Sequence, residues 1–498
     1  MADDSWHLRL LNRIELAGNR LPHPTALFIY FSLFVLALSW LLSFLGISAQ
    51  HPTLNQTIIV TNLISQQGLH RILESTVTNF TQFAPVGTVL IAMLGLGIAE
   101  KSGLLAALLK RIVGNAKGKL LSATVVFAGV MSSLAADAGY VVLIPLAGII
   151  FASAGKHPLA GMAAAFAGVS GGYSANLLVG PIDAVLAGIS TEAAQLVDSS
   201  IEISVLSNYY FIIASTVFIT IAGTWITEKV TLPALPSWAP TEAPVDNKVT
   251  LLERRGLRQA GIMFMVCVAL IILGLVPDSG LLRDPETHSI ARSPFVSGIV
   301  SLISLIAALS GIVFGVATGR YHRKGSVIED MEATMATMAS YLVLMFFAAQ
   351  FINYFAWSNI GLILAITGAN WLQNLALSPV LLLSIFILMS AFINLLIGSA
   401  SAKWSLLAPI FIPMFLLLGI APEQVQAAYR VGDSSTNIIT PLMPYFGVVV
   451  AFMQRYDKDL GVGTIVSLML PYSVMFLIFW SILFAIWMVS GFAFGPLS

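Results

Sequence analysis

The sequence predicts an all-α polytopic membrane protein, with about nine transmembrane helices and two re-entrant hairpins that enter from opposite faces. Three observations support this fold class. Of the 498 residues, 57% are hydrophobic and only 10% are charged, against about 25% charged in an average soluble domain. Apolar runs of about 20 residues, long enough to cross a bilayer as helices, recur along the chain. Two longer apolar blocks contain small and polar residues near their middles.

The composition also excludes several classes of protein. So few charges cannot cover a soluble surface, which argues against cytosolic, disordered and nucleic-acid-binding proteins. The 24 basic and 24 acidic residues balance, so net charge indicates no polyanionic partner. Cys267 is the single cysteine, and the seven histidines show no metal-ligand spacing. The sequence has no HExxH or P-loop motif, and we therefore expect neither an enzyme nor an organic cofactor.

Hydrophobicity divides the chain into two membrane halves. The first half, 26–227, contains the broken block 121–151, and the second half, 261–498, contains the broken block 379–418. A charged, proline-rich cytoplasmic linker is predicted at 228–260, and residues 1–25 are predicted to form a cytoplasmic N-terminal segment. Single spans are predicted at 26–46, 83–100, 158–182, 208–227, 261–277, 295–318, 331–351, 422–452 and 464–490. The stretch 352–378 is predicted to form an amphipathic segment at the outer surface.

The distribution of basic residues orients these spans. With a cytoplasmic N-terminus, the inside segments hold 19 basic residues and the outside segments only Arg71, Arg283 and Arg292. Lys403 and Arg430 remain within apolar segments. This assignment requires each broken block to return to the side that it entered from. We therefore expect two re-entrant hairpins, although two thin spans in each block would leave the same parity. The C-terminus is expected outside.

The two halves also resemble each other weakly. Residues 136–140 align with 400–404. Residues 171–176 align with 432–437, and both of these two segments end in Asn. Each half thus has a hairpin with an aromatic residue after its tip, followed by a span broken by small polar residues. Unpaired backbone groups at such breaks are tolerated where they line a cavity. The halves are therefore predicted to form an inverted repeat whose tips and broken helices build one central site.

Apart from acids at the ends of spans, few charged residues lie within or directly beside the predicted spans and broken blocks: Asp137, Asp183, Lys403, Arg430 and Asp433. A charge in the bilayer is costly, so each is expected to face a cavity or a partner. Arg430 is predicted to hold a substrate carboxylate through two hydrogen bonds. The alternative is a salt bridge to Asp433, one helical turn away.

The remaining candidates each have a functional and a structural interpretation. Trp404 offers a flat face for an aromatic substrate, or packs the hairpin tip. Asp183 is a proton carrier, a substrate contact, or a solvated acid at a helix end. Lys403 is expected to reach outward from the hairpin, and Asp137 to cap a helix. Pro422 opens its span, a common position for proline on structural grounds alone.

Oxygen-bearing side chains gather at the two breaks. Asn394, Asp433 and Asn437 in the second half, and Asn176 in the first, carry oxygen ligands that suit Na⁺. A lone buried Asp also suits a proton carrier. The alternative is that these groups only cap broken helices. Without a nucleotide motif, we expect a Na⁺ or H⁺ gradient to drive any transport.

One stretch points to a known family. Residues 430–445 read Arg-Val-Gly-Asp-Ser-Ser-Thr-Asn-Ile-Ile-Thr-Pro-Leu-Met-Pro-Tyr, which closely resembles the AbgT family of bacterial transporters, named for p-aminobenzoyl-glutamate uptake. Residues 171–183 and 398–409 carry the same resemblance, which extends over nearly the whole chain.

The resemblance implies a homodimer in the bacterial cytoplasmic membrane, with nine spans and two opposed hairpins per subunit and a periplasmic C-terminus. It implies substrates such as p-aminobenzoyl-glutamate and, for some members, export of sulfonamide antimetabolites. It places the substrate path at Asp183, Trp404, Pro422 and Arg430, and a sodium site near Asn394 and Asp433.

The leading prediction is an ion-gradient-driven secondary transporter of aromatic carboxylates or sulfonamides that works by alternating access. A Na⁺-coupled di- or tricarboxylate transporter is the runner-up, and a ring-stacking Trp404 argues against it. An ion channel, a different class of protein, would need a continuous polar pore, whereas the charges within the spans gather at two breaks.

Overall fold

The computed structural model describes residues 24–50, 56–114, 120–135, 139–238, 249–277, 279–288, 293–323, 325–443, 445–458 and 460–496. Within these ranges the regular structure is helical, apart from one antiparallel pair of strands, β1 (Ser48–Gln50) and β2 (Thr57–Ile59). Seven of the described helices are long and apolar enough to cross a membrane. The predicted fold class, an all-α polytopic membrane protein, is confirmed.

The first half contains helices of uneven length. In order they are α2 (Pro24–Phe44), α3 (Gln66–Thr81), α4 (Ala84–Lys101), α5 (Leu104–Gly114), α6 (Leu120–Met131), η1 (Ser132–Ala135), η2 (Gly139–Leu143), α7 (Ile144–Ser153), α8 (Pro158–Phe166), η3 (Ala167–Gly171), α9 (Pro181–Ala194), α10 (Tyr209–Ile226), η4 (Thr227–Thr231) and α11 (Leu232–Ala234). Non-helical residues 172–180, here named the first break, separate η3 from α9.

The second half follows the same plan. Its helices are α12 (Leu251–Leu275), α13 (Pro294–Ser297), α14 (Ile299–Ala317), α15 (Ser326–Thr337), α16 (Ala339–Trp357), α17 (Ile360–Asn374), α18 (Pro379–Asn394), α19 (Ala400–Leu416), α20 (Pro422–Thr436), α21 (Phe446–Met453) and α22 (Val462–Ser490). The second break is 437–445. The first tip lies between α6 and η2, where the structure describes only residues 132–135 (η1), and the second tip, 395–399, joins α18 to α19.

The order of elements repeats between the halves, as the weak sequence similarity predicts. Two short helices joined by a tip, a helix that ends at a break, a short helix beyond the break and a long helix occur in this order in each half. Each predicted broken block is a pair of helices of 10–17 residues, too short to cross a bilayer alone as an ordinary span of about 20 residues. Their re-entrant arrangement stays a prediction.

Local sequence explains where these elements begin. Proline occupies the first turn of α8, α9, α18 and α20, where its missing N–H has no helical partner to lose. Ser378 and Ser399 cap α18 and α19 with their side-chain oxygens. The breaks follow runs of small and polar residues, Gly171–Gly172 in one half and 433–437 in the other.

Two predicted boundaries differ from the structure. Helix α12 begins at Leu251, so the last ten residues of the predicted linker 228–260 are helical, and a capping box between Thr250 and Glu253 fixes this start. The stretch 352–378, predicted as an amphipathic segment at the outer surface, is helical, and its place at the membrane surface stays a prediction. It completes α16 and forms α17, which buries one face against α19.

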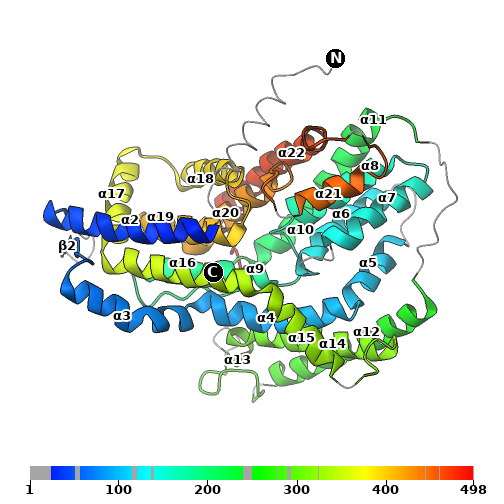
Figure 1. Ribbon diagram of the computed structural model, residues 1–498, viewed down its shortest axis with the longest axis horizontal. Helices are drawn as coiled ribbons and strands as arrows, with labels where there is room; N and C mark the ends of the chain where they lie inside the picture. The colour runs from blue at the N-terminus through cyan, green and yellow to red at the C-terminus, as the bar shows by residue number, and fades with distance from the viewer. Residues whose placement is uncertain are drawn as a thin grey trace.

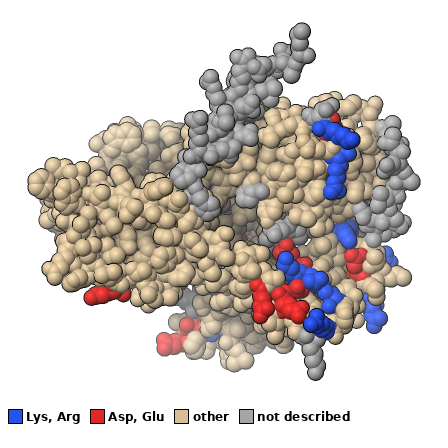
Figure 2. Space-filling model, in the orientation of Figure 1, with Lys and Arg blue, Asp and Glu red and all other residues tan. Residues whose placement is uncertain are grey.

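The helices form a scaffold around the tips and breaks (Figure 1). Helix α2 lies along α16, and α12 lies along α14, which packs on α4. The tip-bearing helices pack on the broken ones, with α6 against η3 and α18 against α20. Large apolar side chains such as Phe44, Leu273 and Val489 are exposed, as expected for a surface that faces lipid. On the face in Figure 2, most Lys and Arg lie at the right-hand end, where Figure 1 places α5, α11 and α12.

Candidate functional site

A cavity of about 350 Å³ lies where the two tips and the two breaks meet. This volume falls within the range of about 300–1,000 Å³ that is typical of small-molecule sites. Both halves contribute to its wall, together with α4 and the junction of α15 with α16. The lining residues include Ser133, Tyr140, Tyr173, Pro181, Tyr341, Ser399, Ser401, Asn437, Met443 and Tyr445. The predicted central site is therefore present as a cavity between the repeats.

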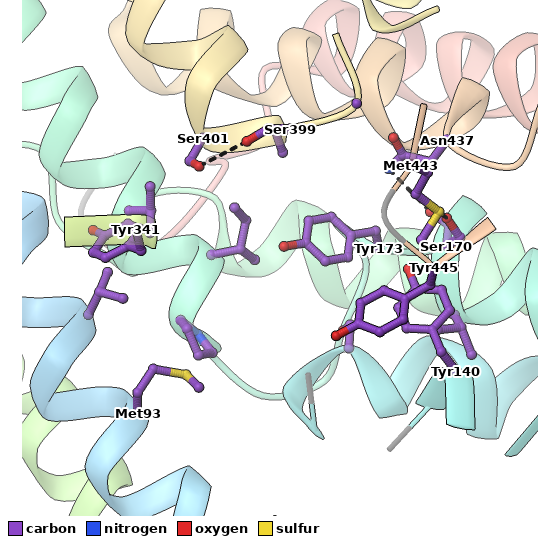
Figure 3. A pocket seen from close by; sticks show the side chains of 18 of the residues that line it. Met93, Tyr140, Ser170, Tyr173, Tyr341, Ser399, Ser401, Asn437, Met443 and Tyr445 are labelled. Atoms are coloured by element: carbon purple, nitrogen blue, oxygen red, sulfur yellow. Dashed lines mark hydrogen bonds between the residues drawn. The ribbon is translucent and has the colours of Figure 1, made fainter. Parts of the chain in front are cut away.

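Aromatic side chains form much of this wall. The rings of Tyr140, just after the first tip, and Tyr445, in the second break, stack with centroids 4.5 Å apart and planes 8° apart. Figure 3 shows Tyr173 in the middle of the cavity, with this stacked pair on one side and Tyr341 on the other. The Tyr341 hydroxyl donates to the main-chain oxygen of Pro85. The cavity thus offers flat faces and hydroxyl groups, a combination that suits an aromatic ligand with polar substituents.

Two helices begin at the cavity. Helix α19 starts at Ala400, next to the lining residues Ser399 and Ser401, and α9 starts at the lining residue Pro181. Helix N-termini carry partial positive charge and attract anions. The cavity wall therefore favours a negatively charged group, although no Lys or Arg occurs among its described lining residues.

Arg430 and Asp183 form a buried ion pair beside the cavity. Arg430 Nη1 lies 2.7 Å from Asp183 Oδ1, and the side chains are 2% and 5% exposed. Asp183 Oδ2 accepts a hydrogen bond from the Gly180 N–H, at the start of α9. The alternative of an Arg430–Asp433 salt bridge is therefore not what the structure shows. Arg430 Nε has no hydrogen-bond partner among the described residues.

Tyr173 connects this pair to the cavity. It lines both the 350 Å³ cavity and a small second cavity of about 10 Å³, which Asp183 and Asn176 also line. Arg430 itself does not line the larger cavity. A ligand in the larger cavity would therefore meet Tyr173 on its way to the charged pair.

A second buried ion pair joins the second tip region to α20. Lys403 Nζ lies 2.5 Å from Asp433 Oδ1, and both side chains are almost completely buried. The expectation that Lys403 reaches outward is wrong, because its ammonium points inward and also donates to the side-chain oxygen of Asn394. Asp433 Oδ1 accepts a further hydrogen bond from the Tyr429 hydroxyl at 3.2 Å.

Asn394 links the same helices through its amide nitrogen. Its Nδ2 donates to the Asp433 main-chain oxygen, to Thr436 Oγ1 and to Asn437 Oδ1, at 2.6–2.9 Å. In the first half, Asn176 Nδ2 donates to Ser133 Oγ at 2.8 Å, and Asn176 Oδ1 accepts from the Leu178 N–H. The predicted Asn and Asp residues thus do gather at their breaks. Of the four, Asn437 alone lines the larger cavity.

The sodium site implied by the resemblance can be tested against these contacts. Na⁺ is a hard cation that would need the side-chain oxygens of Asp433 and Asn394. Asp433 Oδ1 and the Asn394 side-chain oxygen both contact the Lys403 ammonium, which therefore occupies the position between them. Two cations cannot occupy one position, so Na⁺ does not fit these oxygens with the side chains as they stand.

Trp404 and Pro422 lie away from the described lining of the larger cavity. Trp404 is fully buried, and its ring stacks on Tyr429 with centroids 4.5 Å apart. The Trp404 indole N–H donates to Ser190 Oγ at 3.0 Å, which ties α19 to α9. Pro422 occupies the first turn of α20 and is buried. Both residues are packed in this structure, and their contact with substrate stays a prediction; Asp137 lies outside the described residues.

Sequence reasoning missed the tyrosines that line the cavity. Tyr140 and Tyr173 both fall in the repeated stretches, and Tyr140 aligns with Trp404 as the aromatic residue after a tip. That position was the available signal. Tyr445 lies in the stretch that carries the family resemblance, but nothing in its local sequence indicates that it stacks on Tyr140.

Comparisons with known proteins agree with the geometry. Residues 9–498 match the model of the family described as "AbgT putative transporter family". The p-aminobenzoyl-glutamate transport protein of Escherichia coli (strain K12) is 38% identical over 488 residues, which cover 98% of this chain and 96% of that protein.

Two solved structures are similar in fold as well as sequence. The crystal structure of the Alcanivorax borkumensis YdaH transporter is 51% identical with a TM-score of 0.92, and the match covers 95% of this chain and all of that one. The structure of Neisseria gonorrhoeae MtrF, which represents a class of antimetabolite efflux pumps, is 48% identical in sequence with a TM-score of 0.92. The match covers 96% of this chain and 97% of that one.

Proposed function

The chain belongs to the AbgT family of transporters, and from that premise we propose that it is a secondary transporter of aromatic carboxylates, sulfonamides, or both. Substrates resembling p-aminobenzoyl-glutamate, sulfonamide antimetabolites, or both would cross the membrane by alternating access. The E. coli relative is named for the first substrate class, and MtrF is associated with antimetabolite efflux.

One observation carries this proposal: the cavity between the repeats combines stacked tyrosines with two helix N-termini. A benzoyl ring would lie against Tyr140, Tyr445 or Tyr173, and its carboxylates would face the starts of α9 and α19. Tyrosine, and not Trp404, would supply the aromatic surface, because Trp404 is packed on Tyr429. Alternating access would come from movement of the tips and breaks that surround the cavity.

Arg430 would bind substrate at a later stage of the cycle. Its Nε donor has no partner among the described residues, and a buried donor without a partner is costly. A carboxylate that passes Tyr173 could take this donor and replace Asp183 in part, as a guanidinium can bind a carboxylate with two parallel hydrogen bonds. Asp183 would then hold Arg430 in place between substrates.

The remaining features of the proposal concern the surroundings of the site. An ion gradient, of Na⁺ or H⁺, would drive transport, because the sequence has no nucleotide motif. The protein would lie in the bacterial cytoplasmic membrane as a homodimer. Its N-terminus would be cytoplasmic and its C-terminus periplasmic, in agreement with the distribution of basic residues.

The proposal can be tested in proteoliposomes. Labelled p-aminobenzoyl-glutamate and a labelled sulfonamide would be followed in both directions, under separate Na⁺ and H⁺ gradients. We expect saturable transport of at least one compound, stimulated by one of the gradients and lost in Arg430→Ala. Transport of neither compound would contradict the substrate class. Transport that neither gradient stimulates would contradict coupling to Na⁺ or H⁺. Wild-type transport rates in Arg430→Ala would contradict the role of Arg430 in binding substrate.

A further inference from the structure

The geometry points to Lys403 as the resident cation of the second break. Its ammonium occupies the position between Asp433 and Asn394 that a metal ion would need, so the chain supplies a tethered positive charge there in place of Na⁺. This inference deepens the proposed function. It rests on the proposed function only for the part that this site plays in transport. It concerns the chemistry of one site, and ion binding can test it without any substrate.

The contacts of the ammonium resemble those of a coordinated cation. Lys403 Nζ lies 2.5 Å from the Asp433 carboxylate and also contacts the side-chain oxygen of Asn394. Lys403 is 0% exposed and Asp433 1% exposed. A charge so far from water is stable only with an opposite charge and hydrogen bonds around it. The pair therefore depends on both partners, and neither has an alternative in solvent.

The orientation of Asn394 is fixed by its other contacts. Its amide nitrogen donates to three oxygens of α20 and the second break, those of Asp433, Thr436 and Asn437. The amide oxygen must then point the opposite way, toward Lys403. A side-chain flip would put the amide N–H₂ group against the ammonium and an oxygen against three other oxygens. The network thus presents two oxygens to one cation, and Lys403 supplies that cation.

The matching positions that the structure describes in the first half carry no such charge pair. In the alignment of the repeats, Gly139 corresponds to Lys403 and Gly172 to Asp433. A side chain at Gly139 would overlap Ser132 Oγ, and one at Gly172 would lie 2.6 Å from the Gly168 main-chain oxygen. The first break is instead linked to the first tip by the hydrogen bond from Asn176 Nδ2 to Ser133 Oγ, whereas a buried charge pair links the second tip region to α20. The difference marks the second break as the one where a cation matters.

The Lys403–Asp433 pair also connects the second tip region to the broken helix α20. Lys403 lies on α19 just after the second tip, and Asp433 lies on α20 just before the second break. Ser399 and Ser401, on the same turn as Lys403, line the larger cavity. The tethered cation thus holds the tip against the broken helix next to the proposed substrate, a role that a bound ion would otherwise fill.

The test measures Na⁺ binding and thermal stability of the purified full-length protein in detergent. For the wild type, we expect no Asp433-dependent binding of ²²Na⁺ and no change in Tm when choline chloride is replaced by NaCl at constant ionic strength. Lys403→Ala removes the ammonium and leaves room beside Asp433. It should have a lower Tm in choline and regain about 2–3 °C in NaCl at saturating Na⁺.

Two further variants serve as controls. Lys403→Met fills the same space without charge, so it should be destabilised and insensitive to Na⁺. Lys403→Ala/Asp433→Asn removes both charges and should fold without responding to Na⁺, because no carboxylate remains to bind it. The inference would be overturned if the wild type bound ²²Na⁺ and Asp433→Asn abolished that binding. It would also be overturned if the Tm of Lys403→Ala were the same in NaCl and in choline chloride.

These outcomes are independent of the substrate. If the wild type transports neither labelled compound yet behaves as expected toward Na⁺, the proposed function fails and the inference about Lys403 stands. If the wild type transports a labelled compound but binds Na⁺ at Asp433, the proposed function stands and the inference about Lys403 fails. Should Lys403→Ala not be recovered in a folded form, the wild-type binding measurement alone decides.

Discussion

Arg430 and Asp433 lie three residues apart on α20, yet each pairs with a different element. Arg430 reaches Asp183 on α9, and Asp433 reaches Lys403 on α19. Removing one partner of a buried ion pair typically costs about 3–5 kcal/mol, because the other charge is left without compensation. Replacing both partners with apolar residues is often nearly neutral. This difference allows a structural role of each pair to be separated from a functional one.

The Arg430–Asp183 pair gives the first prediction at the residue scale. Arg430→Met alone should destabilise the protein by about 3–5 kcal/mol, whereas Arg430→Met/Asp183→Leu should recover most of the wild-type Tm. If Arg430 binds substrate, the double variant should remain unable to transport despite its stability. The measurements are Tm in detergent and substrate flux in proteoliposomes. A stable double variant with wild-type flux would show that the pair serves packing alone.

The stacked tyrosines give a second prediction at this scale. Tyr445→Leu removes the ring that stacks on Tyr140 in the cavity wall. Since an aromatic pair is worth about 0.5–1.5 kcal/mol beyond its buried area, we expect KM for an aromatic substrate to rise about 2–10-fold. Tyr445→Phe keeps the ring and is the matched control. Equal KM values for the leucine and phenylalanine variants would argue that the substrate does not use this surface.

At the scale of elements, glycine sets how closely the tip-bearing helices approach the broken ones. A Cβ at Gly432 in α20 would overlap the main-chain oxygen of Ile387 in α18, and one at Gly168 in η3 would overlap that of Val126 in α6. The same crossing, with a glycine against a carbonyl oxygen, thus occurs in both halves. Small residues allow this backbone contact between membrane helices.

These crossings predict different results for two glycines of the second half. Gly432→Ala should force α18 and α20 apart, lower Tm and abolish transport, because the neighbour is rigid backbone. Gly447→Ala in α21 has nothing within 4 Å of the new methyl group and should behave as wild type. Both variants would be compared by Tm and flux. Normal behaviour of Gly432→Ala would mean that the two helices are free to separate.

At the scale of the whole molecule, orientation follows from charge. The predicted inside segments hold 19 of the 24 basic residues, and basic side chains on the visible face gather at the end that contains α5, α11 and α12 (Figure 2). With Cys267 replaced by serine, Ser199→Cys should react with a membrane-impermeant maleimide in intact cells. His322→Cys should react only after the membrane is opened. The opposite pattern would invert the proposed topology.

Much of the fold could be predicted because the thickness of the bilayer sets the length of a membrane-spanning helix. A helix must be about 20 apolar residues long to cross it, so runs of that length identified most spans and the two broken blocks. Boundaries failed where tertiary packing was decisive. Residues 352–378 contain aromatic and amide side chains that suggest a surface, and the sequence did not show that helix α17 there packs one face against α19.

The candidate site was predicted in part. The sequence singled out its ionisable residues because each charge within a span is unusual and needs a partner. It could not assign those partners. Arg430 and Asp433 share a helical face by spacing, so local reasoning pairs them, whereas the helices that cross α20 supply Asp183 and Lys403 instead. Likewise, Tyr140 and Tyr445 are 305 residues apart, and only their meeting at the cavity makes a stacked pair.

The sequence by itself determined that this chain is a polytopic membrane protein with two related halves, because bilayer thickness and the cost of buried charge act on local stretches of residues. Only the tertiary structure decided which charges neutralise each other, which aromatic rings face the cavity, and that Lys403 lies between Asn394 and Asp433. Those outcomes depend on contacts between helices that are distant along the chain. No local pattern encodes them, because the crossing of two helices belongs to neither helix alone.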